Sequence, residues 1–314
     1  MRHEQLSVGE LEVDSITGAG IELFSRKKIY LDPTAGSDGN DGLTITRAKK
    51  TLAAALGRIT TGKSDTIIWV QGASHLSLSA DPAWSYNLTN LVGNAGPGMV
   101  NKRCKITMAS DYGSPALTIS GYGNVFANLF HEHGFGATKV ALQGVAISGH
   151  YNTFKGVHFG GPLNDTLGAD ASYRGVVITG INSHFDHCVF GFDTIDRTGA
   201  NSLVSLGPNT MTTFEDCIFL TRISGTTPYF FEVLNTSAVT RAFFKRCQFI
   251  ALSTNMAVTM AEAFNFTGGS TCAMVFDSEC TFMKVTKIAA TGSYGYIWVP
   301  AGAAADKMTS VILS

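Results

Sequence analysis

The fold is decided by five segments that repeat one pattern: Phe154-Lys-Gly-Val-His-Phe159, Phe185-Asp-His-Cys-Val-Phe190, Phe214-Glu-Asp-Cys-Ile-Phe219, Phe244-Lys-Arg-Cys-Gln-Phe249 and Phe276-Asp-Ser-Glu-Cys-Thr-Phe282, the last with one inserted residue. Their first phenylalanines are 29 to 32 residues apart. A near-constant period of this length is typical of proteins built from stacked repeats. The sequence therefore predicts a repeat architecture.

Each repeat has the side-chain periodicity of β-strands. Cys188, Cys217, Cys247 and Cys280 each lie two residues before a phenylalanine, and a period of two puts both side chains on one face of a strand. A second β-rich piece precedes each motif, and about 30 residues leave no room for a crossover helix. We therefore predict a parallel β-solenoid in which equivalent residues stack about 4.8 Å apart.

Stacking would place phenylalanine on phenylalanine and gather the cysteines into an interior ladder. Free cysteine behaves as a small buried apolar residue. Metal binding is the alternative for the cysteines, but no Cys-x-x-Cys pair supports it. We expect no cofactor.

Composition excludes several classes of protein. The chain has 314 residues, 45% of them hydrophobic and 15% charged, with a formal net charge of −1. The absence of a basic block argues against nucleic acid as a partner, and no apolar run approaches the roughly 18 residues of a membrane span. The first five residues, Met-Arg-His-Glu-Gln, do not open a signal peptide. Six cysteines without a disulfide pattern suit folding in a reducing cytoplasm.

The first β-rich region carries a family resemblance. Ile29-Tyr-Leu-Asp-Pro-Thr-Ala-Gly-Ser-Asp-Gly-Asn-Asp-Gly-Leu43 is followed by Ala48-Lys-Lys-Thr-Leu-Ala-Ala-Ala-Leu-Gly57. This region resembles the amino-terminal part of right-handed parallel β-helix proteins of the pectate-lyase-like superfold. The resemblance implies an all-β, right-handed parallel β-helix over residues 29–286, with a capping helix near 48–57. That superfold hosts lyases, hydrolases and non-enzymatic phage spikes, so it does not specify chemistry.

The two ends of the chain differ from the repeats. Residues 1–28 alternate apolar and polar side chains but are too short to build a core, so we predict an arm that docks on sister chains or on a virion shell. Its binding side chains would be Leu6, Val8, Leu11, Val13, Ile16, Ile21 and Leu23. The alternative is an edge strand packed on its own domain. Residues 287–314 are expected to leave the repeat and form a C-terminal cap or trimer contact.

Two groups of acidic residues are candidate sites. Asp38, Asn40 and Asp41 lie in a glycine-rich loop that could bind calcium, although Asx-rich turns also satisfy their own backbone without metal. Asp186 and Glu215 occupy the same position in neighbouring repeats, so they could form the pair of carboxylates that glycoside hydrolysis requires. The flanking repeats have Lys155 and Lys245 there, which favours a mixed-charge ladder.

Other candidates are weaker. Asp193 and Asp196 form a second acidic group, and His184 with His187 is a possible metal pair. Four aromatic residues lie in or beside loops, where they could stack on sugar rings, on a partner subunit or on the solenoid wall: Trp84, Tyr86, Tyr112 and Tyr122.

Three classes of function remain, and we predict the first. It is a structural bacteriophage virion protein, similar to trimeric tailspike-like proteins: a capsid decoration (cement) protein, located in the virion and bound to the major capsid protein or another virion protein. The second is a short tailspike that binds or depolymerises a host surface polysaccharide. The third is a bacterial carbohydrate-active enzyme.

Overall fold

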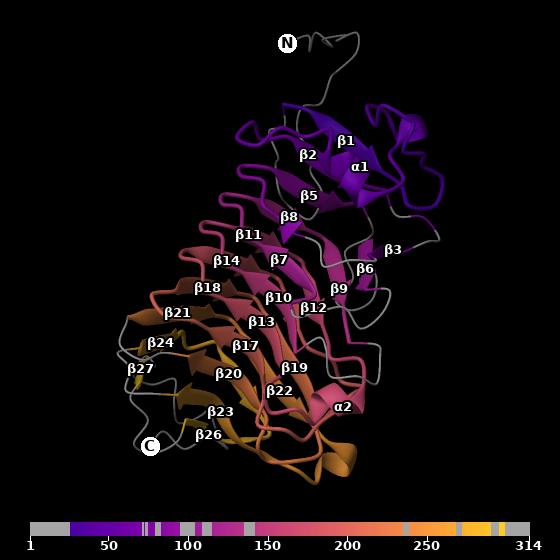
Figure 1. Cartoon of the computed structure of the whole chain (residues 1–314). Coiled ribbons are helices and arrows are strands. Elements are labelled where there is room, and N and C mark those ends of the chain that lie inside the picture. Colours follow the sequence, from indigo (N-terminus) through magenta and orange to yellow (C-terminus); the bar gives the residue numbers. More distant parts are fainter. Residues whose placement is uncertain are drawn as a thin grey trace, which may run out of the picture.

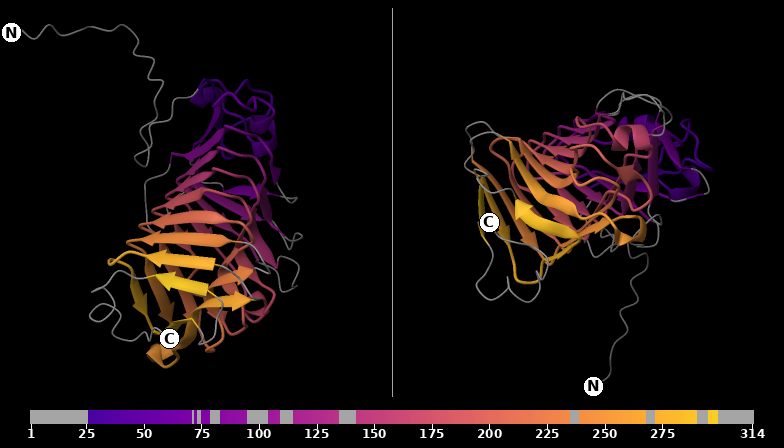
Figure 2. Two further views of the ribbon diagram at one scale, coloured as in Figure 1. Left: turned by 90° about the vertical axis from the view of Figure 1, so that its left-hand side faces the viewer. Right: turned by 90° about the horizontal axis from the view of Figure 1, so that it is seen from below.

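Parallel strands stacked in three sheets make up the described part of the chain. The structure is a computed structural model and describes residues 26–70, 72, 75–78, 83–94, 104–108, 115–134, 142–234, 239–267, 272–289 and 295–298. Each turn of the coil adds a strand to the first, then the second, then the third sheet (Figure 1). The two views of Figure 2 show successive turns lying side by side from the indigo to the yellow end. The predicted parallel β-helix is confirmed.

The strands of each sheet pair only in parallel within the described residues. The first sheet contains β1 (Lys28–Leu31), β2 (Thr66–Trp69), β5 (Asn90–Gly93), β8 (Val125–Ala127), β11 (Thr153–Lys155), β14 (Ser183–Asp186), β18 (Met211–Glu215), β21 (Thr240–Lys245), β24 (Cys272–Phe276) and β27 (Gly295–Trp298). The second contains β3 (Leu76–Leu78), β6 (Cys104–Met108), β9 (Leu129–Glu132), β12 (His158–Gly160), β15 (Val189–Phe190), β19 (Ile218–Ile223), β22 (Gln248–Leu252) and β25 (Thr281–Met283), with β16 (Asp196–Arg197) added beside β19. The third contains β4 (Ala83–Trp84), β7 (Leu117–Ile119), β10 (Gln143–Ile147), β13 (Arg174–Ile178), β17 (Ser202–Leu206), β20 (Tyr229–Leu234), β23 (Met260–Thr267) and β26 (Val285–Ala289).

Two short helices accompany the strands. α1 (Leu52–Leu56) lies within the predicted range, and its first turn is capped by Thr51, whose hydroxyl accepts a hydrogen bond from the Ala54 amide. Leu52 and Ala55 are buried in the core. α2 (Asp165–Gly168) is capped in the same way by Asn164. Single 3₁₀ turns cover Ile45–Arg47 and Thr254–Met256.

Stacked phenylalanines fill the interior. In the first sheet Phe214 stacks between Phe185 and Phe244, with ring centroids 5.0 and 5.2 Å away. In the second sheet Phe219 stacks between Phe190 and Phe249, at 4.9 and 4.8 Å. Offset or edge-to-face ring pairs add stabilisation beyond the area they bury. The predicted ring stacks are therefore the core of the molecule.

The cysteine ladder also lies inside. Cys188, Cys217 and Cys247 are fully buried, and all six cysteines are free. The thiols of Cys188, Cys217 and Cys247 each donate to a carbonyl of the preceding turn, as Cys217 does to the Phe185 oxygen at 3.4 Å. Burial raises the pKa of the Cys217 thiol. These cysteines pack as small apolar groups with a satisfied thiol.

Four successive turns between the first and second sheets share one backbone conformation. Gly156, His187, Asp216 and Arg246 have φ between 51° and 58°, in the left-handed region. The His187 and Asp216 amides each donate to a carbonyl of the next turn, at 3.0 and 2.9 Å. Equivalent residues of successive turns are therefore held in register.

The sheets extend beyond the predicted domain limit. β26 runs across the boundary expected after residue 286, and β27 pairs with β24 in the first sheet. Part of the segment expected to leave the repeat therefore continues it. The predicted arm lies almost entirely outside the described residues. No helix in the described part of the chain is long and apolar enough to cross a membrane.

Candidate functional site

The charged residues that end the strands of the first sheet form a column on the outside of the β-helix. The strand register places Lys155 beside Asp186, Asp186 beside Glu215, and Glu215 beside Lys245. These residues lie one turn apart, about 4.8 Å along the axis. Asp186 and Glu215 are therefore neighbours, as the repeat predicts.

Each carboxylate of this column has basic partners. Lys155 Nζ lies 3.2 Å from Asp186 Oδ2. His184 Nε2 and Lys245 Nζ lie 3.5 and 4.0 Å from Glu215 Oε2. The mixed-charge interpretation thus describes the contacts of Asp186 and Glu215.

A second charged column follows directly after the first, in the left-handed turn residues. Arg246 donates from Nε and Nη2 to the two oxygens of Asp216, both at 2.7 Å, and from Nη2 to Glu215 Oε1 at 2.8 Å. His187 Nδ1 hydrogen-bonds Asp186, and its Nε2 lies 3.9 Å from Asp216 Oδ2. We did not predict Asp216 or Arg246 as site residues. His187, Asp216 and Arg246 occupy the same position in three successive repeats, and this regularity in the sequence could have identified them.

Hydrogen bonds from neighbouring basic groups favour the ionised form of Asp186 and Asp216. Partial burial acts to raise the pKa of Asp186, but hydrogen bonds from His187 and Lys155 outweigh it and lower the pKa. The hydrogen bonds of Arg246 lower the pKa of Asp216. A general acid that works near neutral pH needs a raised pKa. The spacing of Asp186 and Glu215 would suit a pair of catalytic carboxylates, but the lowered pKa of Asp186 does not suit an acid.

Metal ligation has a candidate here that differs from the predicted histidine pair. Ligand atoms of Asp186, His187 and Asp216 lie within 4.8 Å of one another, whereas His184 is directed to Glu215. The guanidinium of Arg246 already engages both oxygens of Asp216. A cation of the chain thus occupies the position that a metal would need.

The loop proposed for calcium is closed by its own hydrogen bonds. Asp38 Oδ1 accepts from the Lys50 and Thr51 amides at 3.0 and 2.9 Å, and the Asp38 carbonyl accepts from Lys49 Nζ at 2.8 Å. Burial acts to raise the pKa of Asp38, but the hydrogen bonds of Thr51 and Lys50 lower it. These contacts favour the capping-turn interpretation.

The other two candidates in this loop have partners of the same kind. Asn40 Nδ2 donates to the Ala48 carbonyl at 3.0 Å. Asp41 accepts from the Leu43 amide at 3.0 Å and lies 3.1 Å from Arg47 Nη2.

The second acidic group is divided by the structure. Asp196 lies 2.8 Å from Arg222, whereas Asp193 is exposed. On the outer face of the third sheet Glu232 pairs with Arg174, and Glu262 lies 3.4 Å from Lys287. Asp196, Glu232 and Glu262 therefore each face a base.

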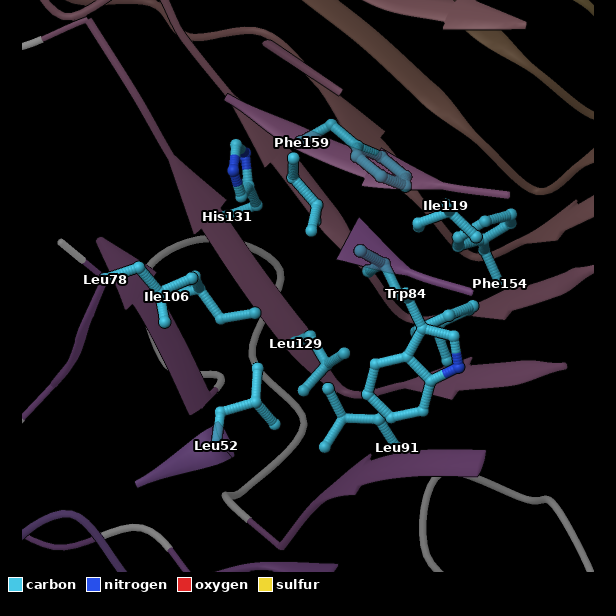
Figure 3. A pocket seen from close by; sticks show the side chains of 13 residues that line it. Leu52, Leu78, Trp84, Leu91, Ile106, Ile119, Leu129, His131, Phe154 and Phe159 are labelled. Carbon is cyan, nitrogen blue, oxygen red and sulfur yellow. The ribbon is translucent and has the colours of Figure 1, made fainter. Parts of the chain in front are cut away.

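The pocket in Figure 3 lies inside the coil and is almost entirely apolar. Leu52 of α1, Trp84, Phe126 and Leu129 contribute to its wall, together with the buried imidazole of His131. Its volume is about 30 Å³, roughly the space of one water molecule and far below a ligand pocket of about 300 Å³ or more. It cannot hold a sugar.

The aromatic candidates have different positions. Trp84 is only 3% exposed, so the interpretation of Trp84 as an exposed sugar-stacking residue is wrong. Tyr86 packs against the core, and Tyr122 is 47% exposed. Tyr112 lies outside the described residues.

The arm residues predicted to bind a virion shell also lie outside the described part of the chain: Leu6, Val8, Leu11, Val13, Ile16, Ile21 and Leu23.

Solved structures share this architecture. Pectate lyase Pel9A superposes with a TM-score of 0.56 at 12% identity, and the alignment covers 96% of this chain and 81% of the lyase. The fold is the pectate-lyase-like parallel β-helix. Pectin methylesterase PemA from Erwinia chrysanthemi follows with a TM-score of 0.50 at 13% identity, covering 91% of this chain and 96% of the esterase.

A viral protein is also among the solved structures that align with this chain. The structure named Geobacillus virus E2 ORF18 aligns with a TM-score of 0.45 at 13% identity, covering 86% of this chain and 60% of that chain. No family model matches the sequence, and no curated protein matches it. At 12–13% identity the likeness to the lyase and the esterase shows the fold alone.

Proposed function

We propose that the chain is a non-catalytic structural protein of a bacteriophage particle, a homotrimeric β-helix that decorates the capsid. The observation that carries the non-catalytic part is the double charged column, in which Asp186, Glu215 and Asp216 all face bases. Exposed ion pairs of this kind contribute only about 0–1 kcal/mol each to stability. These ion pairs cover the outer turns with charges that are paired within the chain. Charged side chains on an exposed surface disfavour aggregation with other chains.

Attachment to the particle is assigned to residues 1–28. Their alternating apolar side chains cannot form a core alone, so sister chains or a capsid surface would order them. Three arms on one trimer would bind together, and such avidity holds a small protein on a shell without a large footprint.

A second candidate is a short tailspike that acts on a host polysaccharide. The likeness to two proteins named for pectin favours it. The two candidates differ in chemistry, since only the tailspike would cleave or bind a glycan chain.

Two experiments test the proposal. The purified protein is incubated with capsular and cell-wall polysaccharides, and new chain ends are measured; we expect none. Cleavage that disappears in Asp186→Asn or Glu215→Gln would establish the enzyme instead.

The second experiment concerns location. Electron microscopy of particles carrying labelled protein should show it on the capsid, and a chain lacking residues 2–25 should fold but not join particles. Label on the tail, or full decoration by the truncated chain, would contradict the capsid assignment.

A further inference from the structure

One side of the β-helix has five successive turns without charged residues, and these turns expose large apolar side chains. They are turns from the third sheet to the first, at residues 85–89, 120–124, 148–152, 179–182 and 207–211, here called the uncharged edge. None of these turns contains Asp, Glu, Lys or Arg. Five of their large apolar side chains are between 36% and 61% exposed: Leu88, Tyr122, Tyr151, Ile181 and Met211.

The strand pairing makes these turns neighbours in space. β5, β8, β11, β14 and β18 are consecutive strands of the first sheet, and each begins at or just after one of these turns. At about 4.8 Å per turn the uncharged edge is about 19 Å long. A hollow of about 190 Å³ lies at its far end, where Ile181, Met211 and Val239 line it together with polar residues and the exposed Arg241 of the next turn.

The edge is held rigidly from within. Buried Asn124 accepts from the Thr89 amide and hydroxyl at 2.9 and 3.0 Å, and buried Asn152 accepts from the Asn124 amide at 2.9 Å. Glycines let adjacent turns approach closely: a Cβ on Gly149 would lie 1.9 Å from the Gly121 carbonyl oxygen. The apolar side chains are thus presented on a fixed backbone, which lowers the entropy cost of binding.

The opposite character of the charged columns shows that the fold does not require this composition. Both sets of turns are exposed and stack at the same spacing, yet the turns that follow Phe154, Phe185, Phe214, Phe244 and Phe276 all carry charge, whereas the five turns of the uncharged edge carry none. Depletion of charge with exposed Tyr and Met is the compositional signature of a protein interface. Exposed apolar surface of this extent is a liability unless a partner covers it.

We propose that the uncharged edge is the surface on which copies of this chain pack against one another, around an axis parallel to the β-helix, an inference that rests on the homotrimer proposed above. A second copy presents side chains at the same spacing, so the two edges can match along their length. In a parallel cyclic arrangement equivalent positions meet at the same height. Charges there would oppose like charges, and the uncharged edge avoids this cost.

The test introduces a charge where the backbone tolerates it. Tyr151 has φ 57° and is 61% exposed, and Asp is among the residues that accept this left-handed conformation. Met256, with φ 54° and 37% exposure, lies in a 3₁₀ turn away from the edge. Tyr151→Asp and Met256→Asp therefore make a matched pair, measured by sedimentation over a range of concentrations.

We expect an oligomer for the parent chain and for Met256→Asp. Tyr151→Asp should weaken association by at least about 100-fold, because like charges would converge at the axis. Met211→Lys is the second variant, and circular dichroism establishes that each variant is folded. In addition, Tyr151→Cys should be joined between copies by a short bis-maleimide, since the interior cysteines are buried.

The outcomes separate this interface from the proposed function. An oligomer that Tyr151→Asp and Met211→Lys leave intact, with no cross-link through Tyr151→Cys, would overturn the interface while a capsid location could still hold. A parent chain that stays monomeric at every concentration would overturn both the interface and the trimer.

Discussion

Removing one ring from the middle of the phenylalanine stack should cost more than removing one from its end. Phe214 is fully buried and stacks on Phe185 and Phe244 on its two sides. Truncation of a buried Phe to Ala costs about 3–5 kcal/mol, and aromatic pairs add about 0.5–1.5 kcal/mol each. We therefore expect Phe214→Ala to lower the free energy of unfolding by about 5 kcal/mol.

The matched variant is Phe282→Ala in the second sheet. Phe282 is 7% exposed and stacks on Phe249 on one side, so about 3 kcal/mol is expected. Urea unfolding is followed by circular dichroism and by the fluorescence of buried Trp69 and Trp84. Equal losses in the two variants, or a loss below about 2 kcal/mol for Phe214→Ala, would refute the view that ring stacking through successive turns stabilises the coil.

Three further outcomes are expected. Cys188, Cys217 and Cys247 should react with a thiol reagent only after unfolding, because they are buried; rapid labelling of the native chain would disprove the ladder. Arg246 holds the pKa of Asp216 below its ordinary 3.8, so the stability that this pair contributes is present above pH about 4 and is lost as the pH falls through the folded pKa. In Asp216→Asn the free energy of unfolding should therefore depend less on pH in that range. The same pH dependence in the variant and the parent would contradict this. Burial lowers the pKa of His133 from 6.5 to about 4, so on acidification the unfolded chain binds a proton before the folded chain does. The free energy of unfolding should therefore fall between pH 6.5 and pH 4, and it should fall less steeply in His133→Gln. An equal slope in the two proteins would show that His133 does not contribute.

The repeat predicted the centre of the molecule because two periods coincide there. The phenylalanine spacing of 29 to 32 residues gives the turn, and the period of two gives the inward face. At the C-terminal end the sequence motif is lost but the strands still pair: β27 contains no Phe motif, yet it pairs with β24. Backbone hydrogen bonds continue a sheet regardless of side-chain type, so the repeat underestimates its length.

The candidate site was predicted in part. The common motif position placed Asp186 beside Glu215, but it did not show that Arg246 would reach back one turn to both Glu215 and Asp216. That contact depends on the left-handed conformation of the turn, which is uncommon for residues other than glycine and so cannot be predicted from these residue types. The pairing of Arg174 with Glu232 was equally hidden, because it joins strands two turns apart across β17.

The contrast between the two sets of turns follows from the way a repeat protein is stabilised. The backbone of each turn pairs only with the adjacent turns, so an exposed turn residue is little constrained by the core, and charge is the usual choice at such positions. The charged columns satisfy themselves within the chain, as the contacts of Arg246 with Asp216 show. Tyr122 and Tyr151, which are 47% and 61% exposed, carry no charge with which to form such ion pairs. This contrast, over five successive turns that Asn124 and Asn152 hold rigid, is why we propose that a second copy of the chain covers the uncharged edge.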